Sequence, residues 1–256
     1  MSYKYYYSSV KGTSHEKTNT PKQDSLCVVN CDANNKNYFI SAIADGAGTA
    51  KYSDISAKFI CKYLSKKMLL WLKNNELTEF NQEIFCSWIK QIQSILNRYI
   101  KIFKMTSLRD FATTILFAVL SDNTNLFIQI GDGVITIGNC TELNCVFKPQ
   151  KGEYANTTHF ATEEHFENNL MFKFINENVE RIAMHTDGIE MISLINLEKP
   201  SLPFFNPFFN ALEDEKAGYN DDLSKELTEF LCSERVNKRT NDDKTLVIAM
   251  KANNHD

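Results

Sequence analysis

The sequence has few of the residues that mark linkers and no apolar run long enough to mark a membrane span. Only 9 of its 256 residues are glycine and 5 are proline, and they do not cluster between segments. We therefore expect residues 1–256 to form a single domain. No stretch approaches the roughly 20 apolar residues that cross a bilayer, and Met1–Val10 lacks the apolar centre of a signal peptide. We expect a cytoplasmic chain with no membrane partner.

An excess of positive charge is also missing. The chain carries 28 Lys and Arg against 32 Asp and Glu, a formal net charge of −4. A nucleic-acid-binding domain normally shows the opposite balance, so we expect no nucleic-acid partner. Hydrophobic residues make up 43% of the chain, which is enough for a sizeable buried core.

The cysteines lack the spacing of a zinc site or a disulfide framework. There are seven, an odd number, and most lie inside apolar runs. Cys27/Cys31 and Cys140/Cys145 are too far apart for a CxxC motif, and no histidine pair accompanies them. Reduced, buried thiols of a cytosolic protein explain this pattern better.

The first half of the chain predicts a hairpin followed by two long helices. Leu26–Cys31 and Tyr38–Ala44 are short apolar strands separated by the turn-forming Asp32–Asn37. A helical pattern runs from Asp54 to about Asn74. Asn81–Met105 shows the clearest helical repeat, with apolar residues at three- and four-residue intervals.

Short strands dominate the second half. We expect strands at 112–120, 126–130, 134–138, 144–147, 171–175, 179–184 and 246–250. A helix should begin near Gly188 and another should run through 223–231, while the phenylalanines of Phe204–Phe209 belong to the core rather than to a recognition surface. Hairpin-linked strands interrupted by consecutive helices favour an α+β fold, in which two antiparallel sheets are covered by helices.

Acidic residues recur where apolar strands end, next to small or turn-forming residues. Carboxylates in such places, beside glycines that let a backbone carbonyl approach, suit a hard cation. Oxygen-only ligands favour Mg²⁺ or Mn²⁺ over zinc. One Asp-Gly turn means little, because such turns are common, but the repetition is informative. These residues are Asp24, Asp45, Asp132, Asp187, Asp242 and Asp243.

The order of these acidic blocks resembles the metal-dependent protein phosphatases of type 2C, and most closely a bacterial branch of that family. Each motif is weak alone, but six in the right order across nearly the whole chain are strong. The stretch 151–156 also resembles the flap of the bacterial branch. The six blocks are Gly12–His15 with Gln23-Asp24, Ala44–Gly48, Ala112–Thr114, Gly131–Gly133, Thr186–Glu190 and Asp242–Thr245.

The resemblance implies a fold and a set of metal ligands. The family fold is an αββα sandwich, two packed antiparallel sheets with helices on both outer faces, in agreement with the pattern above. Asp45 would bridge two Mn²⁺ or Mg²⁺ ions, and the Gly46 carbonyl would bind one of them. Asp187 and Asp242 would complete the other ion's shell, while Asp24 would hold metal-bound waters.

The resemblance also implies a mechanism. Two cations roughly 3.5–4 Å apart lower the pKa of a bridging water, so that hydroxide attacks the phosphoryl group directly, without a covalent intermediate. A third, weaker ion would involve Asp132. No Cys-x5-Arg loop of a cysteine-based phosphatase is present. We expect a monomeric phosphatase acting on phosphorylated Ser and Thr of proteins, with a cognate Ser/Thr kinase.

Two positions depart from the family pattern. Many relatives carry a histidine, the proposed acid for the leaving alkoxide, where this chain has Ala47, and an arginine that grips phosphate where it has Asn19. His15, Lys17 and Lys22 are nearby replacements. We favour His15, in an expected polar loop, as catalytic and phosphate-binding residue, with Lys17 as a further phosphate contact. A metal-bound water is the alternative acid.

Two other functions remain open. The missing histidine and arginine motivate a phosphate-sensing or scaffolding module that keeps the fold with little turnover. Against it, clustered carboxylates repel one another without cations. A phosphatase of a small phosphometabolite would use the same metal chemistry. His185 we interpret as a structural histidine near the site, and the role of the 151–170 flap stays open.

Overall fold

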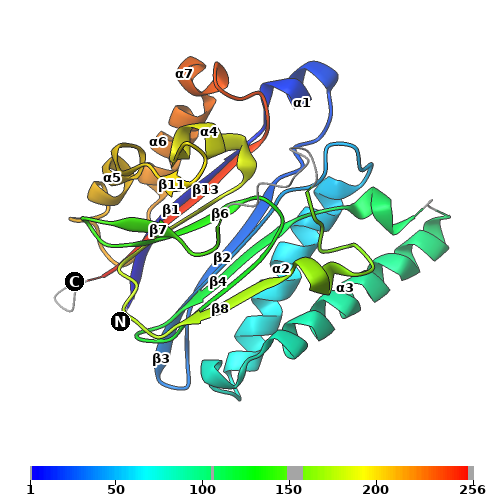
Figure 1. Ribbon diagram of the computed structural model, residues 1–256, viewed down its shortest axis with the longest axis horizontal. Helices are drawn as coiled ribbons and strands as arrows, with labels where there is room; N and C mark the ends of the chain where they lie inside the picture. The colour runs from blue at the N-terminus through cyan, green and yellow to red at the C-terminus, as the bar shows by residue number, and fades with distance from the viewer. Residues whose placement is uncertain (1, 105–106, 149–157, 253–256) are drawn as a thin grey trace.

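The computed structural model describes residues 2–104, 107–148 and 158–252, and in it two β-sheets pack face to face (Figure 1). The five-stranded sheet has the order β2 (Ser25–Ala33), β3 (Lys36–Ala44), β4 (Ile115–Leu120), β5 (Asn125–Ile130) and β8 (Met171–Ile175). The six-stranded sheet has the order β12 (Gly218–Tyr219), β1 (Tyr3–Val10), β13 (Lys244–Lys251), β9 (Arg181–His185), β6 (Val134–Gly138) and β7 (Leu143–Cys145). All neighbours are antiparallel except β1 and β12.

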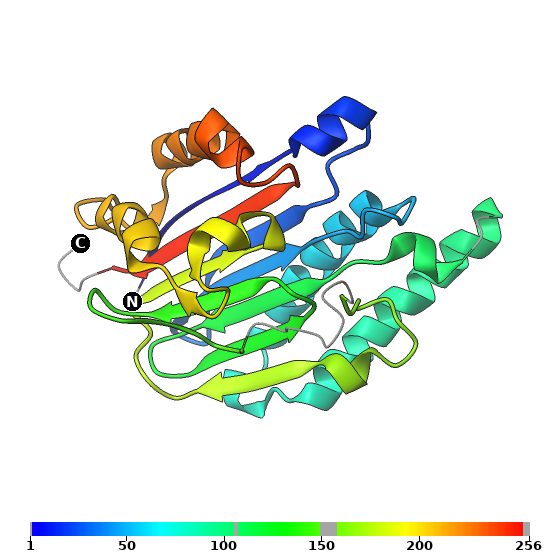
Figure 2. The same cartoon turned by 45° about the horizontal axis from the view of Figure 1, so that its top comes forward.

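Helices cover the outer face of each sheet, which confirms the predicted αββα sandwich (Figures 1 and 2). The long helices α2 (Ser53–Leu72) and α3 (Gln82–Phe103) lie on the five-stranded sheet, and α5 (Leu202–Asn210) and α6 (Asp221–Cys232) lie on the six-stranded one. The shorter elements are α1 (Thr13–Thr18), α4 (Glu190–Ser193), α7 (Glu234–Asn237), the 3-10 turns η1 (Leu77–Glu79), η2 (Leu108–Phe111), η3 (Phe166–Asn169) and η4 (Asp187–Ile189), and the pair β10 (Leu194–Ile195) and β11 (Lys199–Pro200).

The core consists of three apolar layers. Side chains alternate across a strand, so neighbouring residues of β3 serve different layers. Phe39 and Ile43 pack between the two sheets, whereas Ile40 packs under α2 and α3. Phe205 belongs to the third layer, between the six-stranded sheet and its helices.

The predicted hairpin and the clearest predicted helix are both present. Asn34 and Asn35 have φ of 48° and 59° between β2 and β3, as a two-residue hairpin turn with positive φ at both positions requires. The Asn81 side chain caps α3 by accepting from the Ile84 N–H at 3.0 Å, and Lys104 ends the helix with φ of 53°. None of the helices in the described ranges combines the length and apolar character of a membrane span.

The N-terminal strand β1 was not predicted. It pairs with β13 along its whole length, from Tyr3 opposite Lys251 to Val10 opposite Lys244. We did not recognise the strand because its composition is polar and rich in tyrosine. Lys4, for example, is buried in the strand, and its ammonium group donates a hydrogen bond to the Glu213 carbonyl at 2.8 Å. Asp24 therefore precedes the second strand of the fold rather than the first.

The phenylalanine-rich segment forms α5, and its four phenylalanines differ in how deeply they are buried. Phe205 and Phe209 are fully buried against the six-stranded sheet. Phe204 and Phe208, on the other side of the helix, are half-buried and line a surface groove. These two rings pack against the core without being part of its fully buried interior, because α5 is apolar on two faces.

Candidate active site

A cavity of about 460 Å³ lies where the strand ends carrying the predicted acidic residues meet. The residues that line it range from Ser14 to Asp242 along the chain. The predicted site residues that line it are His15, Asp45, Gly46, Asp132, Asp187 and Asp242. Asp24 is buried and bonded to the Thr186 hydroxyl next to Asp187.

Asp45 is fixed by the paired threonines of the neighbouring segment. Its backbone N–H donates to the Thr114 hydroxyl at 2.9 Å, and its carbonyl accepts from the Thr114 N–H at 2.8 Å. The Thr113 hydroxyl donates to the same carbonyl at 3.0 Å. The threonine block therefore sets the position from which the Asp45 carboxylate enters the cavity.

Two glycines allow the segment before β13 to lie against the rest of the site. A Cβ added at Gly188 would lie 1.8 Å from the Asp243 carbonyl oxygen, and one added at Gly12 would lie 2.3 Å from the Asp242 carbonyl carbon. Any side chain at either position would displace this backbone. The three sequence blocks that contain Gly12, Asp187 and Asp242 depend on these close approaches to meet.

Two buried carboxylate oxygens at the site lack a hydrogen-bond partner in the described part of the chain. Asp24 accepts from the Thr186 hydroxyl at 2.8 Å and the Thr245 hydroxyl at 2.6 Å, both through Oδ2. Its Oδ1 and the Oδ1 of Asp187 are buried without a partner. Buried polar atoms are rarely left unsatisfied, so both oxygens are suited to an additional positively charged ligand or its water.

The ionised form of the acidic cluster is unfavourable when no cation balances its negative charges. Burial raises the pKa of Asp24 to about 7, with a contribution from Asp243. Burial also raises the pKa of Asp187 to about 6, and the charge of Asp132 adds to the effect. Burial and the charges of Asp24 and Asp187 raise the pKa of Asp45 well above its ordinary value. Divalent cations would remove this penalty by favouring the ionised forms.

The donor set fits Mg²⁺ or Mn²⁺. It consists of oxygen atoms, which these hard cations prefer. Within the described ranges, no group of three or more Asp, Glu, His or Cys side chains is placed so that it could hold a metal ion by itself. Mg²⁺ usually keeps several waters and takes only one or two carboxylates, so an open set with the Gly46 carbonyl and water is the expected form. The metal roles of the individual aspartates stay predictions.

Of the three basic candidates for phosphate binding, only His15 lines the cavity. It lies in the short helix α1, not in the polar loop that we expected. Its Nδ1 is 2.9 Å from Oδ1 of Asp243. Lys17 is exposed and does not line the cavity, and its contact with phosphate stays a prediction. The Lys22 ammonium donates to Ser9.

Asp243, one of the recurring acidic residues for which we predicted no individual role, also belongs to the site. Its buried carboxylate accepts from the Gly12 N–H at 2.7 Å, the Gln23 N–H at 2.6 Å and the Asp24 N–H at 3.4 Å, in addition to the contact with His15. It thus joins the closing block to the whole opening block. Its place directly after Asp242 in the closing motif was the only signal in the sequence.

The comparisons with known proteins identify the family. A family model described as Protein phosphatase 2C matches residues 11–232. The chain is also 34% identical over 254 residues to serine/threonine-protein phosphatase 3 of Escherichia coli strain K12, covering 98% of this chain and all of the relative. The chain belongs to the protein phosphatase 2C family. The predicted family and enzyme class, a phosphoric monoester hydrolase acting on proteins, are confirmed.

Solved structures confirm the fold of this phosphatase. The serine/threonine phosphatase of S. agalactiae matches with a TM-score of 0.62 at 16% identity, covering 98% of this chain and 100% of that one. The catalytic domain of the serine/threonine protein phosphatase PstP, in complex with 2 manganese ions, matches with a TM-score of 0.63 at 13% identity, covering 97% and 98%. At such low identity the likeness establishes the fold alone.

Two further segments of the phosphatase complete the site's surroundings. The Thr158 hydroxyl donates to Oδ2 of Asp132 at 2.6 Å, and Phe160 lines the cavity. The motif at 151–156 that resembles a flap lies outside the described residues. His185 is fully buried and bonded through Nε2 to Ser193 at 2.9 Å, in agreement with the structural role predicted for it.

Proposed function

We propose that this phosphatase hydrolyses phosphoserine and phosphothreonine in proteins with the help of two Mn²⁺ or Mg²⁺ ions and a third, weaker one. The observation that carries the proposal is the convergence of Asp45, Asp187 and Asp242 on one cavity, with buried, unpartnered carboxylate oxygens of Asp24 and Asp187 at the site. The name of the E. coli relative supports the choice of serine and threonine as substrates.

The residues of the site divide into direct and supporting ligands. Asp45, Asp187, Asp242 and the Gly46 carbonyl would hold the two main ions, and Asp132, whose Oδ2 accepts from Thr158, would hold the third. Asp24 would act through ordered water from its buried position. When bound, such cations lower the pKa of water and neutralise charge on the phosphoryl oxygens.

The chain's own side chains must then orient the phosphoryl group and supply a proton. At Ala47 a methyl group occupies the place of the family's histidine, so no acid is available there. His15 has one ring nitrogen on Asp243, and its Nε2 makes no hydrogen bond within the described residues. This arrangement leaves Nε2 to donate to a phosphoryl oxygen or to the leaving serine or threonine oxygen.

The wider setting follows from the same proposal. A protein that removes phosphate from serine and threonine implies a kinase that adds it, and a cytoplasmic monomer would serve such a pair. Ala47 and Asn19 favour one competing function, a binding module that recognises phosphorylated proteins without turnover.

The test measures hydrolysis of an aryl phosphate and of a phosphothreonine peptide, with Mn²⁺ and with EDTA. We expect Mn²⁺-dependent turnover of both by the wild type, lost in Asp45→Asn and retained in Asp214→Asn, which changes an exposed aspartate. Turnover of the aryl phosphate alone would indicate a small-molecule substrate or a deficient acid. Metal binding without turnover of either substrate would contradict the proposal in favour of the binding module.

A further inference from the structure

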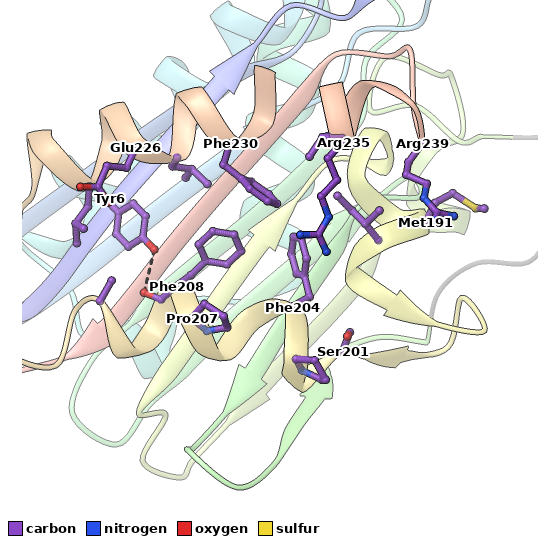
Figure 3. A pocket seen from close by; sticks show the side chains of 16 residues that line it. Tyr6, Met191, Ser201, Phe204, Pro207, Phe208, Glu226, Phe230, Arg235 and Arg239 are labelled. Atoms are coloured by element: carbon purple, nitrogen blue, oxygen red, sulfur yellow. Dashed lines mark hydrogen bonds between the residues drawn. The ribbon is translucent and has the colours of Figure 1, made fainter. Parts of the chain in front are cut away.

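A groove outside the active site lies between α5 and α6, with α4 and α7 at one end (Figure 3). Its volume of about 680 Å³ exceeds that of the catalytic cavity, and the two share no lining residue. Its floor is aromatic and one end is basic, a combination that the phosphatase reaction does not use.

Three phenylalanines form the floor. The ring centroid of Phe208 lies 5.2 Å from that of Phe204 and 5.4 Å from that of Phe230, with edge-to-face geometry in both pairs. All three rings are half-buried. Figure 3 shows them along the groove between the two helices. They form a firm apolar surface that still has area to bury.

The second apolar face of α5 is not needed for packing on the sheet. Phe205 and Phe209, which point the other way, already fill the layer against the six-stranded sheet. Met191 of α4 extends the apolar surface at the groove's rim, with 66% of its surface exposed. A concave, mostly apolar surface with a few polar groups at its edge is the usual form of a binding site.

The basic end consists of Arg235 and Arg239. Both are exposed, and neither makes an ion pair with any residue that the structure describes. Their neighbour Lys238, in contrast, is paired with Glu234 at 2.7 Å. In Figure 3 the Arg235 side chain reaches toward Phe204, and Arg239 lies near Met191. Glu226 lines the groove away from the two arginines. The groove therefore carries negative charge toward one end and positive charge at the other.

We propose that this groove docks an acidic, apolar peptide segment of the protein substrate, separate from the phosphorylated residue. Bulky apolar side chains of the segment lie on the three phenylalanines, and the carboxylates that follow them contact Arg235 and Arg239. The charge distribution selects this occupant, because unpaired arginines bind carboxylates with two parallel hydrogen bonds.

The groove adjoins the segments that carry two of the candidate metal ligands. Met191 follows Asp187 by four residues, and Arg239 precedes Asp242 by three. A segment bound there would keep its phosphorylated residue at a high effective concentration near the catalytic cavity. This consequence rests on the proposed function, whereas binding of the segment does not.

Binding is tested first, without turnover. The probe is a fluorescein-labelled dodecapeptide with two phenylalanines and a leucine ahead of four glutamates, titrated by fluorescence anisotropy. We expect binding that weakens with salt and at least about tenfold weaker binding by the double variant Arg235→Glu with Arg239→Glu. Met191→Ser should weaken it also. Lys62→Glu with Lys66→Glu, the same charge change at exposed residues of α2, should have no effect.

Peptide controls define the chemistry. Glutamine in place of glutamate, serine in place of the apolar residues, and the reversed order should each weaken binding. Equal binding by the arginine variant, or no binding by the wild type, would overturn the proposal. So would self-association, measured by light scattering, or binding to phosphatidylserine vesicles that depends on the arginines while the peptide does not bind.

A second measurement separates docking from catalysis. Joining the apolar and acidic segment to a phosphothreonine peptide should lower its KM, and the arginine variant should lose that gain while keeping wild-type turnover of aryl phosphate. If the wild type does not hydrolyse aryl phosphate, the proposed function is contradicted, whereas the binding result is unaffected. An unchanged KM in the wild type would contradict docking of the substrate.

Discussion

Nδ1 of His15 lies 2.9 Å from Oδ1 of Asp243, so the block that closes the chain orients an imidazole presented by its opening block. The same carboxylate also accepts backbone N–H groups of that opening block, among them Gly12 and Gln23. His15 is thus held from behind by a residue that does not itself line the cavity.

The pair should act as a unit in catalysis. We expect His15→Ala to lower kcat/KM for a phosphothreonine peptide by about 10²-fold, the lower range for a general acid, and to weaken inhibition by phosphate. Asp243→Asn should reduce the same quantities, and the double variant should lose less than the product of the two. Unchanged turnover and phosphate inhibition in His15→Ala would exclude a role for this side chain.

The acidic cluster predicts an unusual pH dependence for the metal-free protein. The pKa of Asp24 is raised from 3.8 to about 7 in the folded state. Folding therefore favours the protonated carboxyl, and this stability is fully present below pH 3.8 and lost as the pH rises toward 7. In EDTA, the wild type should lose this stability as the pH rises, whereas Asp24→Asn should not. We therefore expect the Tm of the variant, relative to that of the wild type, to be higher at pH 7.5 than at pH 5.

Saturating Mn²⁺ should abolish that increase, because cations then replace protons on the carboxylates. The comparison with Asp24→Asn is necessary because burial lowers the pKa of His185 to about 4. That group gives stability above pH 6.5 which is lost as the pH falls toward 4, the opposite trend. A difference in Tm that stays constant with pH would contradict the raised pKa of Asp24.

A methyl group at Gly188 should separate two blocks of the site. Its added Cβ would overlap the Asp243 carbonyl oxygen, and this backbone cannot move without shifting Asp242. We expect Gly188→Ala to lose metal-dependent turnover and to unfold at a lower temperature. Gly48→Ala is the matched control, since its added Cβ would meet only the Gln23 side chain, at 4.0 Å. Equal Tm values for the two variants would refute the close-packing argument.

The hydroxyl of Thr114 should contribute through the backbone of Asp45. Thr114→Val keeps the shape but removes the acceptor of the Asp45 N–H. Leaving that group unsatisfied should cost about 1–3 kcal/mol of unfolding free energy, as measured by urea denaturation. Thr49→Val, at an exposed threonine, serves as the control for stability. A loss in the control equal to that in Thr114→Val would show that the hydrogen bond is unimportant.

Local patterns in the sequence predicted most elements of the fold because their causes are local. The hairpin depends on two asparagines that adopt positive φ, and α3 on an apolar repeat capped by Asn81. The acidic blocks predicted the cavity because each carboxylate lies next to one end of a strand. Motif order then supplied what spacing alone could not, the family and the metal chemistry.

The features that were missed depend on contacts distant in the sequence. β1 forms because β13 lies beside it, and its tyrosines and Lys4 show little apolar alternation. The role of Asp243 appears only when the opening block is folded against it. The groove was missed because sequence alone does not show which phenylalanines of α5 face the sheet and which face α6.

The pairing of β1 with β13 also has a consequence for the order in which the sheet can assemble during synthesis. Residues 3–10 are made more than 200 residues before their antiparallel partner, residues 244–251. In the nascent six-stranded sheet the place between β1 and β9 therefore stays empty until β13 has emerged from the ribosome. Because Asp242 and Asp243 lie directly before β13, the candidate catalytic cavity cannot be complete before that strand has been made.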